Sequence, residues 1–270
     1  MRQLNREPTV AADIVQVYRT FLANFQVDVQ DVYRRAGFDR VPHSRPGAKV
    51  PLNAVSELLE ISAQAADEPE LGLRFVTDSV PGYFGLLDHL LMSSPTIGDA
   101  FAALEDFIEL SIAPAQARLA ISGQTAVLTV GLPRLLSAPS QQFIDLFAAT
   151  IVRRIKPIEG ARWYPEQISL PRYRPTKLSR YEEGFGPRIN FEASELRLVL
   201  ARSDLQTKQI DICLGLHETV RLAAQNVFAD SGRQSDFADI VGDAISTRLL
   251  ASRRAALTSV ARELSISPRT

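Results

Sequence analysis

Hydrophobic positions in the first third of the chain recur every three to four residues, the period of an α-helix that buries one face. These stripes predict helices over residues 14–25, 31–36, 52–66, 82–92 and 97–108. Gly37 is expected to follow the end of the second helix, where glycine is favoured. The third helix is expected to stop near Pro69, and Thr96 is expected to cap the fifth. This region is therefore predicted to be helical.

Beyond residue 116 the apolar positions alternate, which is the period of a half-buried β-strand. Two such runs, 117–121 and 126–132, flank Gly123-Gln124 and predict a β-hairpin. Further along, the pattern predicts helices over 143–155, 176–184 and 213–227, and short strands over 168–170, 188–191 and 196–200. The expected fold class is α+β, with a mostly helical domain and a small antiparallel sheet.

The polar stretch 229–236 contains Gly232 and is the predicted linker, so that residues 1–228 form one domain. Apolar spacing then predicts a helix over 237–250 and another over 257–264. Ser265-Ile266 would form a turn, after which Ser267 can cap a further helix and Pro268 suits its first turn. A helix-turn-helix introduces its recognition helix in this way. Residues 237–270 are therefore expected to be the incomplete start of an all-α DNA-binding domain.

Composition narrows the class of protein. Hydrophobic residues make up 46% of the 270 positions, enough for a substantial core. The net charge of −1 is uninformative about a nucleic-acid partner. Five arginines against one glutamate from residue 248 onward are compatible with phosphate contact or with a solvated basic tail.

The single cysteine, Cys213, excludes an internal disulfide. Without a signal segment or an apolar run of about 18 residues, a cytoplasmic protein with no membrane partner is expected.

Residues with catalytic chemistry do not fall into a recognised arrangement. The histidines His43, His89 and His217 are scattered, and none has a second ligand at the spacing of a helical metal motif. Neither a nucleophile elbow nor a phosphate-binding loop is present. The chain is therefore not expected to be an enzyme, and no catalytic residue, metal or cofactor is assigned.

Five residues are candidates for contact with a small-molecule ligand. His89 lies among leucines, where it either sits at the rim of a core or offers a polar group to an apolar cavity. Arg172, Tyr173 and Lys177 share a loop, where they are either solvated or hold an anionic head group. Tyr83 follows a glycine at a helix start and either anchors that helix or faces a ligand.

The helix around 210–228 carries more apolar residues than one buried stripe requires. One face would consist of Cys213, Leu216, Val220, Ala223 and Val227. Leu214 and Leu222 lie partly outside it. A helix that is apolar on two sides packs on two sides, either within the monomer or against a symmetry mate. We predict a homodimer with Leu214 and Leu222 at its interface.

Three stretches in series resemble the AraC-type bacterial transcription regulators that carry an N-terminal arabinose-binding-like regulatory domain. The first joins Gly82-Tyr83-Phe84-Gly85 to Leu91-Met92-Ser93-Ser94-Pro95-Thr96-Ile97-Gly98-Asp99-Ala100. The second is Tyr181-Glu182-Glu183-Gly184-Phe185-Gly186-Pro187-Arg188-Ile189-Asn190-Phe191, leading into 196–200. The third is 258–270. The resemblance covers nearly the whole chain.

The resemblance implies a ligand-sensing and dimerising domain followed by a DNA-binding domain of two helix-turn-helix units. Residues 237–250 resemble the opening helix of that second domain, and 258–264 resemble its positioning helix. Ser267, Arg269 and Thr270 match the start of the recognition helix and would contact DNA, with the chain truncated within this first unit. Ser265 departs from the usual glycine of the turn. The alternative is a small-molecule-binding module, or an enzyme, with only a helix-turn-helix-like tail.

Overall fold

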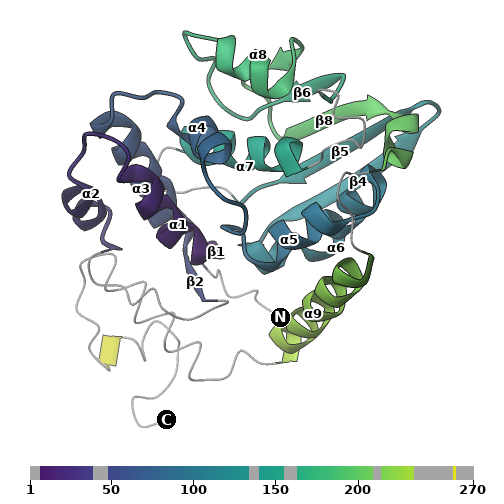
Figure 1. The fold of residues 1–270 in the computed structure, drawn as a ribbon, viewed down its shortest axis with the longest axis horizontal. Coiled ribbons are helices and arrows are strands. Elements are labelled where there is room, and N and C mark those ends of the chain that lie inside the picture. The colour runs from purple at the N-terminus through teal and green to yellow at the C-terminus, as the bar shows by residue number, and fades with distance from the viewer. Residues whose placement is uncertain are drawn as a thin grey trace.

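The computed structural model describes residues 7–38, 48–133, 140–154, 163–208, 214–233 and 258–259. Within these residues the chain folds into two β-sheets with helices packed around them, in agreement with the predicted α+β class (Figure 1). The predicted helix over 237–250 lies outside the described residues. So does the helix-turn-helix fragment, apart from residues 258–259.

The N-terminal half is built on a three-stranded antiparallel sheet in the order β2-β1-β3. Its strands are β1 (Thr9–Ala11), β2 (Lys49–Pro51) and β3 (Ile112–Ala113). The surrounding helices are α1 (Asp13–Leu22), α2 (Val29–Arg35), α3 (Leu52–Ala65) and α4 (Leu71–Asp78). The sequence pattern did not predict this sheet, because strands of two or three residues are too short to show a period. It also did not predict α4, which begins just after Pro69.

The second half contains a five-stranded sheet in the order β4-β5-β8-β6-β7. Its strands are β4 (Gln116–Ser122), β5 (Thr125–Gly131), β6 (Gln167–Ser169), β7 (Ile189–Asn190) and β8 (Leu196–Ala201). The predicted hairpin is present as β4 and β5, joined at Gly123 with φ of 57°. The three short strands predicted over 168–170, 188–191 and 196–200 are present as β6, β7 and β8. The expectation of an antiparallel sheet was wrong, because β6 and β7 are parallel and the sheet is mixed.

Five helices and a short 3-10 turn accompany this sheet. They are α5 (Leu86–Ser93), α6 (Ile97–Ser111), α7 (Gln141–Arg154), α8 (Ser179–Phe185), η2 (Arg202–Gln206) and α9 (Leu214–Arg233). Figure 1 shows α5 and α6 beside β4, with α9 outside them and α8 at the far end of the molecule next to β6. This arrangement places α7 between the two halves.

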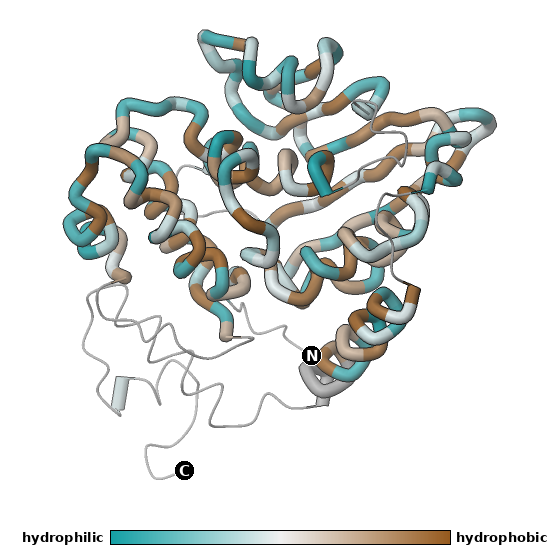
Figure 2. Tube along the Cα trace, in the orientation of Figure 1, coloured by the Kyte–Doolittle hydropathy of each residue, from teal (hydrophilic) through white to brown (hydrophobic). Residues whose placement is uncertain are grey.

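Strand alternation gives the five-stranded sheet one apolar face. Leu128 on β5 is paired with Leu119 on β4 and with Leu198 on β8, so these side chains share a face. Leu128 and Leu198 are completely buried. Figure 2 shows the same alternation of apolar and polar positions along the strands. On the opposite face, Arg118 and Arg197 flank Thr129 and are exposed.

A chain of aromatic rings joins the two halves in the core. Phe75 on α4 lies 4.7 Å from Tyr83, measured between ring centroids, and Tyr83 lies 5.3 Å from Phe84. Phe84 in turn meets Phe147 on α7 edge-on at 5.5 Å. Such tilted and edge-on contacts are favoured between aromatic rings. Burial of these rings fixes α4 and α7 against the loop before α5.

Two local predictions of helix ends are confirmed. Thr96 caps α6, since its Oγ1 accepts a hydrogen bond from the Asp99 backbone N–H at 3.1 Å, while the Asp99 carboxylate accepts one from the Thr96 N–H at 3.1 Å. Gly37 follows α2 with φ of 81°. The helix expected over 82–92 begins only at Leu86, because Gly82 and Gly85 have φ of 114° and 62° and interrupt it.

Helix α9 buries a different side from the one that its sequence suggested. It packs on α5 and α6 through Ala224, which is fully buried, through His217, whose Nδ1 lies 3.4 Å from Ser93 Oγ, and through Phe228. Leu216 and Val227, expected in the buried stripe, are 54% and 51% exposed. The helix also continues to Arg233, through the first five residues of the stretch assigned as linker.

Candidate regulatory site

Helix α7 carries two buried side chains of opposite charge among mostly apolar neighbours. Asp145 is completely buried, and Arg154 is 7% exposed. They lie nine positions apart, so that a rise of 1.5 Å per residue separates them by about 14 Å along the helix. Because an isolated buried charge is very costly, each requires a partner from another element. Two polar clusters result, one towards each end of α7.

The first cluster joins α7 to α8 and to the loop before it. Arg172 from that loop forms an ion pair with the Oδ2 atom of Asp145, and its Nη1 also donates to the hydroxyl of Tyr181. The Tyr181 hydroxyl donates to Asp145 Oδ2 at 2.7 Å. The Arg172 guanidinium carbon lies 5.1 Å from the centre of the Tyr181 ring, a cation–π contact. Arg172 and Tyr181 thus both donate to the same oxygen atom of the Asp145 carboxylate.

Burial controls the titration of this cluster. It raises the pKa of Asp145 to about 7, and the nearby charge of Glu60 adds to this effect, although Arg172 and Tyr181 act in the opposite direction. Burial also raises the pKa of Tyr181, and the Asp145 carboxylate raises it further. Asp145 is consequently a buried acid whose pKa lies close to neutrality.

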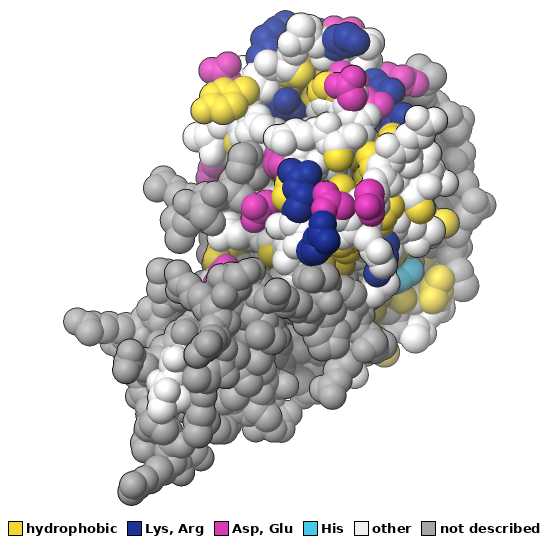
Figure 3. Space-filling model, turned by 90° about the vertical axis from the view of Figure 1, so that its left-hand side faces the viewer, with side chains coloured by type: hydrophobic (Ala, Val, Ile, Leu, Met, Phe, Trp, Pro, Cys, Tyr) yellow, Lys and Arg dark blue, Asp and Glu magenta, His cyan; other side chains and the backbone are white. Residues whose placement is uncertain are grey.

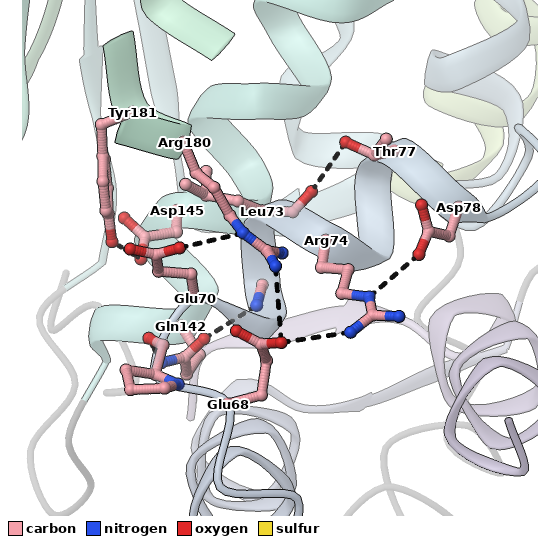
Figure 4. A network of polar contacts seen from close by, with 12 residues as sticks. Glu68, Glu70, Leu73, Arg74, Thr77, Asp78, Gln142, Asp145, Arg180 and Tyr181 are labelled. Carbon is pink, nitrogen blue, oxygen red and sulfur yellow. Dashed lines mark hydrogen bonds and ion pairs between the residues drawn. The ribbon is translucent and has the colours of Figure 1, made fainter. Parts of the chain in front are cut away.

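A chain of ion pairs continues from this cluster to the surface (Figure 4). Arg180 on α8 contacts Glu70 at 3.1 Å and Glu68 at 3.6 Å, both in the segment before α4. Glu68 also contacts Arg74 at 3.1 Å, and Arg74 contacts Asp78 at 3.1 Å. Acidic and basic side chains are intermixed on this face and do not form a patch of one sign (Figure 3). The chain attaches α8 to α4.

The second cluster lies at the other end of α7 and fixes the loop before α5. Arg154 Nε donates to Asp88 Oδ1 at 2.6 Å, and the Gly82 backbone N–H donates to Asp88 Oδ2 at 2.7 Å. The Arg154 guanidinium carbon lies 5.1 Å from the centre of the Tyr83 ring. Since Thr150 already donates to Leu146, the Tyr83 hydroxyl, 3.0 Å away, donates to Thr150. The cluster therefore repeats the arginine–aspartate–tyrosine arrangement of the first.

The five candidate ligand residues are not brought together. Tyr83 is completely buried in the second cluster, and His89 is exposed, with its ring against Gly82. Arg172, only 8% exposed, belongs to the first cluster, where Asp145 neutralises it. Tyr173 and Lys177 are exposed in the same loop. The candidates thus fall into two groups, towards opposite ends of α7.

Sequence reasoning missed the acidic partners of these arginines. Asp88 and Asp145 are both completely buried, yet each stands among the apolar residues of a predicted helix. A carboxylate inside an apolar stripe is the signal that was available, because such a group needs a buried cation. The identity of that cation was not available, since Arg172 and Arg154 lie 27 and 66 positions away.

Sites of two other kinds are absent from the described residues. Among the described residues, no group of three or more histidine, cysteine, aspartate or glutamate side chains is placed to hold a metal ion. In the same part of the chain, no helix has the length and apolar character needed to cross a bilayer.

Comparison with known proteins identifies the class as transcription regulators. Residues 27–209, about two-thirds of the chain, match the family described as the arabinose-binding domain of AraC transcription regulator, N-terminal. The chain therefore belongs to the AraC-type regulators with this N-terminal domain. The match spans the first two of the three stretches that carried the resemblance. It ends before α9 and the C-terminal region.

The other comparisons add less. No curated protein matches the chain. Among solved structures, the crystal structure of the transcriptional regulator CdpR from Pseudomonas aeruginosa is similar over 91% of this chain and 78% of that chain, with 16% sequence identity and a TM-score of 0.48.

Proposed function

We propose that this chain senses a small-molecule effector with its N-terminal domain, residues 1–228, and controls transcription through promoter DNA. The family match over residues 27–209 carries this proposal, because it covers most of that domain. The residue pattern of 257–270, which resembles the start of a helix-turn-helix, supports DNA binding through Ser267, Arg269 and Thr270. We also propose that the protein acts in the cytoplasm, where its DNA target is accessible, and by binding without catalysis.

The two clusters on α7 are the parts of the domain best suited to respond to an effector. Each joins elements that are distant in sequence, and each uses a buried charge that tolerates little change in its surroundings. An anionic effector would meet the exposed Tyr173 and Lys177 beside the first cluster. At the second cluster, Tyr83 lies in the loop before α5, and His89 lies on α5 with its ring against Gly82 of that loop. We propose these residues as effector contacts.

The proposal is tested with the intact regulator and DNA from the region upstream of its own gene. Small molecules that remain bound to the folded protein are first identified by mass spectrometry. A gel shift that is selective for the upstream DNA and changes with the bound molecule is expected. If no DNA is bound selectively and the molecule is chemically converted, the alternative of an enzyme with a helix-turn-helix-like tail is correct.

We further propose that the regulator is a homodimer through α9. Of the nine large hydrophobic side chains that are exposed among the described residues, five lie on this helix: Leu214, Leu216, Leu222, Val227 and Phe228. Such a concentration of exposed apolar side chains is typical of an interaction surface. These side chains lie on two sides of α9. Mutation of one side at a time can therefore show which side contacts the partner helix.

A further inference from the structure

The outer face of the five-stranded sheet, the side opposite the buried leucines, carries a row of polar side chains across all five strands. By the strand register, Arg118 on β4 lies beside Thr129 on β5, which lies beside Arg197 on β8. The row continues through Ser169 on β6 to Asn190 on β7. At about 4.8 Å between neighbouring strands, the row spans about 19 Å, and the backbones of its two arginines are about 10 Å apart. The sheet therefore presents two cations with a hydroxyl group between them.

These arginines are the only charged residues that the five strands place on the outer face; the other positions there are uncharged. Arg118 and Arg197 are exposed, and neither forms an ion pair within the described part of the chain. The acid nearest to Arg197 in sequence, Glu195, lies just outside β8 and is also exposed. By contrast, the arginines Arg34 and Arg180 on helices are each paired with a carboxylate. The outer face thus has positive charge that its own strands do not neutralise.

The uncharged residues of the outer face indicate what kind of anion it suits. Interfaces between proteins are anchored by large apolar and aromatic side chains. The largest apolar side chains on this face are Val127 and Val199, and both are half-buried. Arginine, serine, threonine, asparagine and glutamine, which make up most of the face, are the side chains that contact DNA phosphates. The composition therefore favours a phosphodiester backbone over an acidic protein surface.

We propose that the outer face of the sheet contacts the phosphate backbone of DNA, with Arg118 and Arg197 each bound to a phosphate and the Thr129 hydroxyl between them. This inference rests on the proposed function, because it requires that the regulator binds DNA. It adds a contact from the N-terminal domain to those proposed for the C-terminal residues. Since phosphates are the same in every sequence, this contact raises affinity without distinguishing one DNA sequence from another.

The salt dependence of DNA binding counts such contacts. Each phosphate that a cation neutralises adds about 0.9 to the steepness of log affinity against log salt concentration. The Arg118→Gln and Arg197→Gln variants should therefore each reduce this steepness by about 0.9, and the double variant by about 1.8. Because the contribution disappears near about 1 M salt, each lost contact corresponds to about fivefold weaker binding at about 0.15 M salt.

The experiment measures fluorescence anisotropy of the intact regulator with its upstream DNA and with unrelated DNA, from about 50 to 200 mM salt. Both glutamine variants should lose affinity for the two DNAs by the same factor, so that the selectivity ratio stays at its wild-type value. Two controls should keep the wild-type steepness. Arg118→Lys retains the charge on the outer face, and Arg34→Gln removes an arginine that is already paired on α2. Circular dichroism verifies that each variant is folded.

The outcomes separate this inference from the proposed function. Selective binding to the upstream DNA with an unchanged steepness in the double variant would overturn the inference alone. A wild-type regulator that binds neither DNA would overturn both. If the double variant binds DNA like the wild-type protein but loses its effect on transcription by purified RNA polymerase, the outer face contacts an acidic surface of another protein, and the inference is wrong.

Discussion

At the scale of single residues, each buried arginine in the described part of the domain is paired with an aspartate and lies over a tyrosine ring. Arg154 lies at the end of α7 and Arg172 lies in a loop, yet both side chains adopt this arrangement. A buried ion pair adds little stability over an apolar pair of similar size, but the loss of one partner leaves an unpaired buried charge. The consequence of a mutation therefore depends on which partner remains.

The Arg154→Met variant should lose about 3–5 kcal/mol of unfolding free energy, because Asp88 stays buried without its cation. Urea unfolding of the variant and the wild-type protein measures the difference. The double variant Asp88→Asn/Arg154→Met should recover much of the loss, since no charge remains and the asparagine oxygen still accepts from Gly82. The exposed pair Arg34–Asp31 provides the control, and Arg34→Gln should change stability by less than about 1 kcal/mol. Similar losses in Arg154→Met and Arg34→Gln would contradict this account.

Residue-scale predictions from the sequence succeeded where the interaction is local. Thr96 and Asp99 are three positions apart, so the sequence alone contains both halves of the cap. The same reasoning could not reveal that Arg172 is neutralised, because its partner lies on another helix. A basic residue in a loop was therefore interpreted as exposed or ligand-binding, whereas the fold buries it against Asp145.

At the scale of elements, α9 has two exposed apolar sides. Leu216, Ala223 and Val227 recur at spacings of seven and four residues and form one side. Leu214 and Leu222, eight positions apart, lie on the other, about 80° from each other at 100° per residue. The side between Val220 and Ala224 packs on α5 and α6. The sequence indicated that α9 packs on two sides but could not show which side the monomer covers, since every candidate stripe has helical spacing.

The Leu214→Glu and Leu222→Glu variants should convert the α9 dimer into a folded monomer, because a charge buried in an apolar interface has no partner there. Light scattering at tens of micromolar measures the mass, and circular dichroism verifies the fold. Thr219→Glu, at a polar and exposed position of the same helix, should remain dimeric. A wild-type monomer at this concentration would exclude the interface. Dissociation by Leu216→Glu alone would assign it to the other side of α9.

At the scale of the whole molecule, four tyrosines are buried, and burial raises the pKa of each: Tyr18, Tyr33, Tyr83 and Tyr181. The ordinary pKa of 10 applies to them only after unfolding. Their contribution to stability is therefore complete below pH 10 and is lost as the pH rises through the values of the folded state. Alkali should consequently unfold the domain.

For Tyr83 alone, a pKa of about 12 corresponds to a loss of about 3 kcal/mol of unfolding free energy as the pH rises from 10 to 12. Urea midpoints measured across this interval should fall steeply. In Tyr83→Phe they should fall less, because that side chain does not ionise. Tyrosinate absorbance recorded alongside circular dichroism is the decisive comparison. Ionisation of all six tyrosines before any loss of helix signal would show that the buried ones are accessible.

The fold as a whole was predictable in class but not in arrangement. Helical and alternating periods gave most of the helices and the hairpin of β4 and β5. The three-stranded sheet was not predicted, because β1, β2 and β3 are short and pair with residues that are far away in the sequence. The division into two halves around α7 also depends on contacts between rings that are distant in sequence, such as Phe84 and Phe147, which leave no periodic signal.

The opposite charges near the two ends of α7 also limit how this helix can move. A turn of one residue position, about 100°, would withdraw Asp145 and Arg154 from their partners at the same time. Helix α7 therefore cannot rotate about its own axis without breaking both of these ion pairs. A conformational change that passes through α7 would instead move this helix together with α5 and the loop before α8, to which the ion pairs connect it.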